Sequence, residues 1–146
     1  MQIIINIEPC PYVRMTQRGK YVKWNAQKYL GWKVHFGYLL RQYLIQTKYQ
    51  GEFYSNLLKM SGEIYLPIGK YNRVDLSNLV KAIEDACQGI LYKNDKQIKS
   101  YGSWDMIPIS KDEMPKIILE VESIPDWMNG RIKLLEKKIV IKPSIK

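Results

Sequence analysis

Four polar side chains recur at helical spacing near the middle of the chain: Asp75, Asn78, Lys81 and Asp85. If residues 75–88 form a helix with about 100° per residue, these four share one face. The opposite face, an arc of roughly 120°, is then apolar and consists of Leu76, Leu79, Val80, Ile83, Ala86 and Cys87. Glu84 lies off the polar stripe, and we expect it to be solvated. The helix therefore packs by one side and presents carboxylates and an ammonium group on the other.

Carboxylates beside a lysine suit phosphodiester hydrolysis. Mg²⁺ is held by a few carboxylates together with water and substrate phosphate oxygens, and it activates water and polarises the phosphorus centre. Lys81 would neutralise charge on the phosphate during the reaction. An ordinary solvated helix face shows the same pattern, and Asp75 would also complement the helix dipole. Both interpretations stay open on the helix pattern alone.

The distribution of charge indicates a polyanionic partner. The net charge is +9. Residues 1–51 carry eight Lys/Arg and one acidic residue, for a net charge of +7. Residues 52–130 carry nine Lys/Arg and twelve acidic residues (net −3), and residues 131–146 carry six Lys/Arg and one acidic residue (net +5). An acidic middle between two basic arms fits nucleic acid around a cation-binding centre, although solubility alone would also explain basic arms.

Composition narrows the class of protein. A chain of 146 residues with 46% hydrophobic residues is long enough for one folded domain. No apolar run approaches the roughly 18 residues of a membrane span, and the N-terminus does not resemble a signal peptide. The two cysteines, Cys10 and Cys87, cannot form a disulfide framework or a cysteine zinc site. We therefore expect a cytoplasmic protein with no membrane partner.

Periodicity predicts the elements that position the polar stripe. Helices are expected over 25–48 and 75–88, the second ended by Gly89. Strands are expected over 2–8, 57–66, 97–101 with a possible extension to 107, and 116–122; residues 69–73 read as a loop. Residues 131–141 fit a strand or a short helix. This order predicts an α+β fold in which helices cover one sheet.

A central motif in three parts and an N-terminal entry segment resemble the RusA family of Holliday-junction resolvases. The run Asp75-x-x-Asn78-Leu79-x-Lys81-Ala82-x-x-Asp85-Ala86, then Gly89-Ile90, then Asn94-Asp95-x-Gln97-Ile98, is similar to a family core that usually reads D-x-D-N-L-x-K-A-x-x-D-A-L followed by D-D-x-Q-V. The entry segment Pro9-x-Pro11-x-x-Arg14-x-x-x-Arg18 is also similar. The resemblance spans residues 2–122. It implies one mixed β-sheet with two main helices, a RusA-like domain over residues 1–124, and a basic extension over 125–146 that packs on it or trails from it.

The resemblance also implies site residues. Asp75, Lys81 and Asp95 would be catalytic, Asp75, Asp85 and Asp95 would bind the metal, and Asn78 and Ser77 would support them. Asp85 could instead be a structural partner of Lys81. Two positions depart from the family pattern: Ser77 and Asn94 stand where it has aspartates. Serine at the first position is typical of a phage-type variant, which implies a phage or prophage origin.

The implied activity is a Mg²⁺-dependent endodeoxyribonuclease, with Mn²⁺ as a substitute. A homodimer would cut four-way (Holliday) and related branched DNA by paired nicks, leaving 5′-phosphate and 3′-hydroxyl ends, in association with the nucleoid. The residues expected on DNA phosphates are Arg14, Arg18, Lys20 and Arg73. The alternatives are a branched-DNA-binding protein of the same fold with weakened catalysis, and a basic protein of an RNA assembly.

Overall fold

The computed structural model describes residues 1–14 and 24–141 as a four-stranded sheet with helices. Its elements, in chain order, are β1 (Gln2–Ile5), α2 (Trp24–Gln46), β2 (Leu58–Pro67), α3 (Ile68–Tyr71), α4 (Leu76–Cys87), the 3₁₀ turn η1 (Asp95–Gln97), β3 (Ile98–Ile109), β4 (Lys116–Ser123) and α5 (Asp126–Ile141). The α+β fold with one mixed sheet and two main helices is confirmed.

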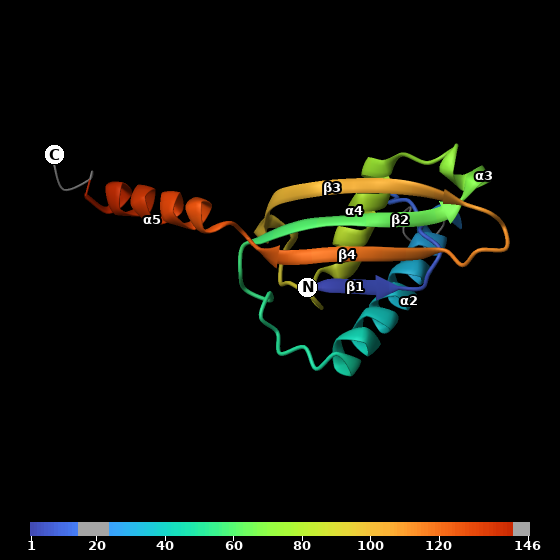
Figure 1. The fold of residues 1–146 in the computed structure, drawn as a ribbon, viewed down its shortest axis with the longest axis horizontal. Coiled ribbons are helices and arrows are strands. Elements are labelled where there is room, and N and C mark those ends of the chain that lie inside the picture. The colour runs from blue at the N-terminus through green and yellow to red at the C-terminus, as the bar shows by residue number, and fades with distance from the viewer. Residues whose placement is uncertain (15–23, 142–146) are drawn as a thin grey trace.

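The strand order in the sheet is β1-β4-β2-β3 (Figure 1). Strand β4 pairs antiparallel with β1 and with β2, whereas β2 and β3 pair in parallel. Parallel neighbours need a long crossover connection, because the chain must return to the same end of the sheet before the second strand starts. Helices α3 and α4 and the turn η1 lie within that connection, so the sheet topology itself carries α4 across the β2–β3 pair.

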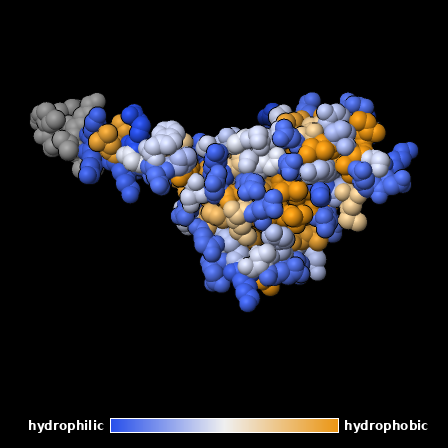
Figure 2. Space-filling model, in the orientation of Figure 1, coloured by the Kyte–Doolittle hydropathy of each residue, from blue (hydrophilic) through white to orange (hydrophobic). Residues whose placement is uncertain are grey.

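One face of the sheet holds the core. In Figure 1, α2 and α4 lie side by side behind the strands, and they contact one another. Alternate residues of β2 and β4 point into this layer and are fully buried, as the period-two pattern of these strands predicts: Leu58, Met60, Ile64, Leu66, Ile117, Leu119 and Val121. The described residues place no helix on the opposite face, where hydrophobic and hydrophilic side chains are mixed (Figure 2).

Two sequence predictions differ from the structure, and one open alternative is decided by it. The expected loop at 69–73 is wrong in part, because Ile68–Tyr71 form α3, which continues from β2 and is closed by backbone hydrogen bonds to the carbonyl oxygens of Ile68 and Lys70. The first strand ends at Ile5, since β4 pairs only as far as that residue. Of the two alternatives left open for residues 131–141, the structure shows the helix, as part of α5, which begins earlier at Asp126 and extends away from the sheet (Figure 1).

No helix in the described part of the chain combines the length and apolar character that crossing a bilayer requires.

The sheet predicts a strict requirement for glycine at position 62. A Cβ there would collide with the backbone oxygen of Ile118 on β4 and lie 2.9 Å from the Trp104 ring on β3. Overpacking of this kind costs about 1–3 kcal/mol, so Gly62→Ala should lower the free energy of unfolding by at least that amount in urea titrations. Gly31→Ala, in open space on α2, should be neutral or stabilising by up to about 1 kcal/mol. Equal effects of the two variants would contradict this account.

Candidate active site

An open cleft of about 670 Å³ lies where α4 faces the η1 turn and strand β3. Eight residues line it: Leu76, Ser77, Val80, Lys81, Glu84, Asp95, Tyr101 and Trp104. The helix supplies the first five, η1 supplies Asp95, and β3 supplies the two aromatic rings. Two carboxylates and one ammonium group therefore share a cleft with partly apolar walls, where interactions between charges are stronger than in open water.

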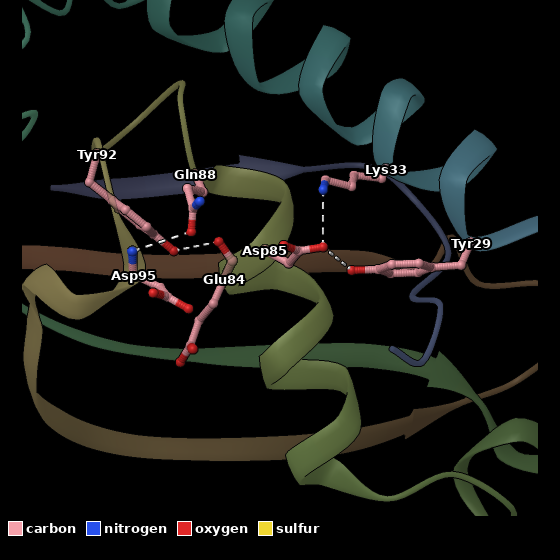
Figure 3. Close-up of polar contacts among 7 residues, drawn as sticks. All are labelled: Tyr29, Lys33, Glu84, Asp85, Gln88, Tyr92 and Asp95. Carbon is pink, nitrogen blue, oxygen red and sulfur yellow. Dashed lines mark hydrogen bonds and ion pairs between the residues drawn. The ribbon is translucent and has the colours of Figure 1, made fainter. Parts of the chain in front are cut away.

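A sharp turn after α4 brings Asp95 to this cleft. Gly89 has φ +84°, a left-handed conformation that favours glycine, and its N–H donates to the carbonyl oxygen of Tyr92 (2.7 Å). The buried Tyr92 hydroxyl in turn donates to the Glu84 carbonyl oxygen (2.6 Å), and the Asp95 N–H donates to Gln88 Oε1 (3.3 Å) (Figure 3). The end of the helix is thus joined by hydrogen bonds to the segment that leads into η1 and to the backbone of Asp95 itself.

The η1 turn is itself held by Asn94 and Gln97. Asn94 Oδ1 accepts from the Lys96 N–H (2.9 Å), and the Asn94 N–H donates to Gln97 Oε1 (2.8 Å), which together form a capping box. Gln97 Nε2 donates to the carbonyl oxygens of Tyr54 (2.9 Å) and Asn56 (2.8 Å). Asn94 therefore acts as an N-cap, a role in which asparagine and aspartate are about equally good.

Glu84 is the residue that the sequence prediction misplaced. It is half-buried and lines the cleft, and its Oε1 accepts a hydrogen bond from the Tyr101 hydroxyl. The prediction of a solvated side chain was wrong because it assumed that α4 buries only the arc from Ala86 to Val80. The structure adds a second wall on the side of Glu84, because η1 and β3 flank the helix there and Asp95, Tyr101 and Trp104 line one cleft with it. The only signal in the sequence was the spacing of seven residues that places Glu84 on the face of Ser77.

The electrostatics of the cleft act on Glu84 and Tyr101. Burial raises the pKa of Glu84 above its ordinary 4.5, and the Asp95 carboxylate adds to this shift, while the Tyr101 hydrogen bond and Lys81 oppose it. Burial and the hydrogen bond to Glu84 raise the pKa of Tyr101, so its hydroxyl remains a proton donor at neutral pH. Glu84 is therefore a carboxylate held at an energetic cost beside a second acid.

Asp85 points to the other side of α4. Its Oδ2 accepts a hydrogen bond from the Tyr29 hydroxyl (2.6 Å) and lies 3.1 Å from Lys33 Nζ, both on α2 (Figure 3). Burial and the bond to Asp85 raise the pKa of Tyr29. Asp85 does not line the cleft. Asp85 therefore joins the two main helices. Lys81, the structural partner that the sequence suggested for it, lines the cleft instead.

The other expected site residues on α4 are spread around it. Ser77 and Lys81 line the cleft, and Lys81 Nζ also lies 4.3 Å from the centroid of the Tyr12 ring. Asn78 is exposed, and its carbonyl oxygen accepts from the Tyr12 N–H (3.1 Å). Asp75 is the exposed N-cap residue of α4, makes no side-chain capping bond, and does not line the cleft.

Two of the expected phosphate-binding residues can be placed. Arg14 is exposed at the end of the N-terminal segment, and Arg73 is exposed with its Nε donating to the Gly69 carbonyl oxygen (3.1 Å). Arg18 and Lys20 lie outside the described residues.

The donors in the cleft fit a magnesium ion that shares its coordination shell with substrate. Asp95 and Glu84 offer carboxylate oxygens and Ser77 a hydroxyl. Mg²⁺ in phosphoryl-transfer sites is commonly held by one or two carboxylates, with waters and phosphate oxygens completing the shell. Over residues 1–14 and 24–141, no group of three or more His, Cys, Asp or Glu side chains forms a ready cage. The set of donors therefore suits an ion held jointly by protein and nucleic acid.

A comparison with protein families supports a nuclease site. The family model described as endodeoxyribonuclease RusA matches residues 7–122, which begin just after β1 and extend through almost all of β4. A search of curated proteins found no match. The matched range contains every residue that lines the cleft and excludes α5.

The raised pKa of Glu84 predicts how stability depends on pH. A carboxyl whose pKa is raised in the folded state contributes stability that is present below its unfolded value of about 4.5 and is lost as pH rises through the folded value. In metal-free protein, Glu84→Gln should therefore raise Tm at pH 7.5 and have little effect near pH 4, as measured by circular dichroism. Glu120→Gln, at an exposed position on β4, is the control. A lower Tm for Glu84→Gln at pH 7.5 would contradict the argument.

Proposed function

The chain belongs to the RusA family of endodeoxyribonucleases, which resolve Holliday junctions, and from this premise we propose that it is a divalent-metal-dependent enzyme that cuts four-way and related branched DNA by paired nicks. The ends would be 5′-phosphate and 3′-hydroxyl. The observation that carries the proposal is the cleft in which Lys81, Glu84 and Asp95 meet beside β3. It brings two carboxylates, which are groups that suit a divalent cation, together with one ammonium group in one cavity of a basic protein.

Each residue has a proposed part in the cut. Asp95, with Asp75 at the start of α4, would hold Mg²⁺ or Mn²⁺, which when bound supplies an activated water and stabilises the leaving oxygen. Lys81 would neutralise charge on the scissile phosphate. Ser77 and Asn78 would orient water or phosphate by hydrogen bonds. Asp85, the further ligand implied by the family pattern, would first have to leave Tyr29 and Lys33.

DNA would be positioned through its backbone and by symmetry. Arg14 and Arg73, which are exposed, together with Arg18 and Lys20, would bind phosphates, and such contacts fix orientation without reading sequence. A homodimer would match the approximate two-fold symmetry of a four-way junction, and each protomer would supply one active site. Paired nicks at symmetric positions follow from that arrangement.

A second candidate is a junction-binding protein that has lost most of its catalysis. Ser77 removes one carboxylate that the family pattern supplies, and no cluster of three potential metal-binding residues is present among the described residues. Such a protein would bind branched DNA equally well with and without a divalent cation and would leave it uncut.

A nicking assay distinguishes the two candidates. It uses a labelled synthetic four-way junction with Mg²⁺, Mn²⁺ or EDTA. The enzyme should produce symmetric nicks only with metal. Because loss of an outer-shell partner alone typically changes activity about 10–100-fold, Asp95→Asn should lower the rate by about 100-fold or more and leave junction binding intact. The control, Asp112→Asn, alters an exposed residue between β3 and β4 and should keep the wild-type rate. Binding without nicks under every metal condition would favour the second candidate.

Phosphate binding predicts a steep dependence on salt. With about four phosphate contacts per protomer, the logarithm of the association constant should fall against the logarithm of salt concentration with a slope of about −3 to −4 per protomer. Arg73→Ala should make this slope shallower by about one, whereas Lys111→Ala, an exposed residue after β3, should leave it unchanged. The measurement is fluorescence anisotropy of a junction titrated at several salt concentrations. A slope near zero would contradict backbone recognition.

A further inference from the structure

The candidate site lacks one carboxylate at position 77, where the family pattern has an aspartate. The Ser77 hydroxyl lines the cleft but carries no charge. Asp75 is exposed at the N-terminus of α4, and neither Asp75 nor Asp85 lines the cleft. Asp95 would therefore have no acidic partner in the cleft if Glu84 were solvated, as the sequence pattern suggested.

Helix geometry places Glu84 on the face of the missing carboxylate. Residues 77 and 84 are separated by seven positions, which at 3.6 residues per turn leaves them about 20° apart around the helix. They are about 10 Å apart along its axis. Side chains lean towards the N-terminus of their helix, and in Figure 3 the Glu84 side chain runs in that direction from its Cα. Because a side chain at position 77 would lean in the same direction, Glu84 enters the cleft on the same helix face but about two turns nearer to the C-terminus of α4.

The surroundings of Glu84 hold it towards Asp95. The Tyr101 hydroxyl donates to Oε1, and the buried Tyr92 hydroxyl fixes the backbone carbonyl of Glu84 itself. Asp95 lines the same cleft from η1, and its N–H is held by Gln88. In the part of the chain that the structure describes, neither acid has an ion-pair partner within 4.0 Å, whereas Asp85 on the same helix has Lys33. Two carboxylates that share a cleft, one held by Tyr101 and the other on a backbone held by Gln88, favour a cation between them.

We propose that Glu84 is a further carboxylate ligand of the divalent cation, acting with Asp95 inside a cleft to which the serine at position 77 contributes no charge. This inference rests on the proposed metal-dependent nuclease and adds a residue to its site. The Tyr101 hydroxyl would occupy one carboxylate oxygen of Glu84 and leave the other for the ion. Lys81, on the same wall of the cleft, would remain available for the phosphate.

Calorimetric titration of the protein with Mn²⁺, without DNA, tests the assignment. Glu84→Gln keeps the volume and the acceptor for Tyr101 and should weaken Mn²⁺ binding by about tenfold or more. Glu120→Gln, the matched control, should bind as wild type does. Unchanged binding by Glu84→Gln would overturn the proposal.

A second measurement uses the wild-type chain and does not depend on any variant folding. Substoichiometric Mn²⁺ should broaden the carboxyl carbon resonances of Glu84 and Asp95 before those of Glu120. Broadening that reaches Asp75 and Asp95 and spares Glu84, or no broadening at all, would overturn the assignment. Because both experiments read the ion without DNA, a chain that binds Mn²⁺ through Glu84 but leaves junctions uncut would refute the nuclease proposal alone.

Discussion

The hydrogen bond from Tyr29 to Asp85 sets the rotation of helix α4, and the rest of the site depends on that rotation. The Tyr29 side chain is fully buried, and the bond is supported by Lys33 from the next turn of α2. A hydrogen bond to a charged group contributes about 1.5–3 kcal/mol, and Ala82 allows the two helices to approach closely at this level. With Asp85 fixed towards α2, Glu84 and Lys81 face β3.

The parallel pairing of β2 with β3 supplies the other wall of the cleft. Since the connection between these strands must cross the sheet, α4 lies over them and its chain has to turn back before β3 begins. That return passes through the left-handed Gly89 and the capped η1 turn, where Asn94 and Gln97 fix the backbone around Asp95. The topology thus brings Asp95 beside a helix residue eleven positions earlier in the chain.

The two departures from the family pattern have different physical consequences. Asparagine at 94 keeps the cap of η1, because its amide oxygen accepts the same hydrogen bond that a carboxylate would. Serine at 77 removes a charge from the cleft, and among the residues that line it Glu84 is the only other acid beside Asp95. Asn94 therefore preserves the hydrogen bond that caps η1. With Ser77 uncharged, the negative charge on this face of α4 is that of Glu84, about two turns further along the helix.

Periodicity and spacing determined much of this protein. The alternation in β2, the amphipathic pattern of α4 and the glycine after it predicted those elements to within a residue or two, and the polar motif from Asp75 to Ile98 identified the family. The helical form of 131–141 was not determined, because apolar and basic residues there follow no single period. The sequence also could not assign Glu84 to the cleft or Asp85 to α2. Helical spacing fixes the angles between side chains on one helix, but the direction in which the whole helix faces is set by its partners, here the Tyr29 side of α2 and the β2–β3 pair.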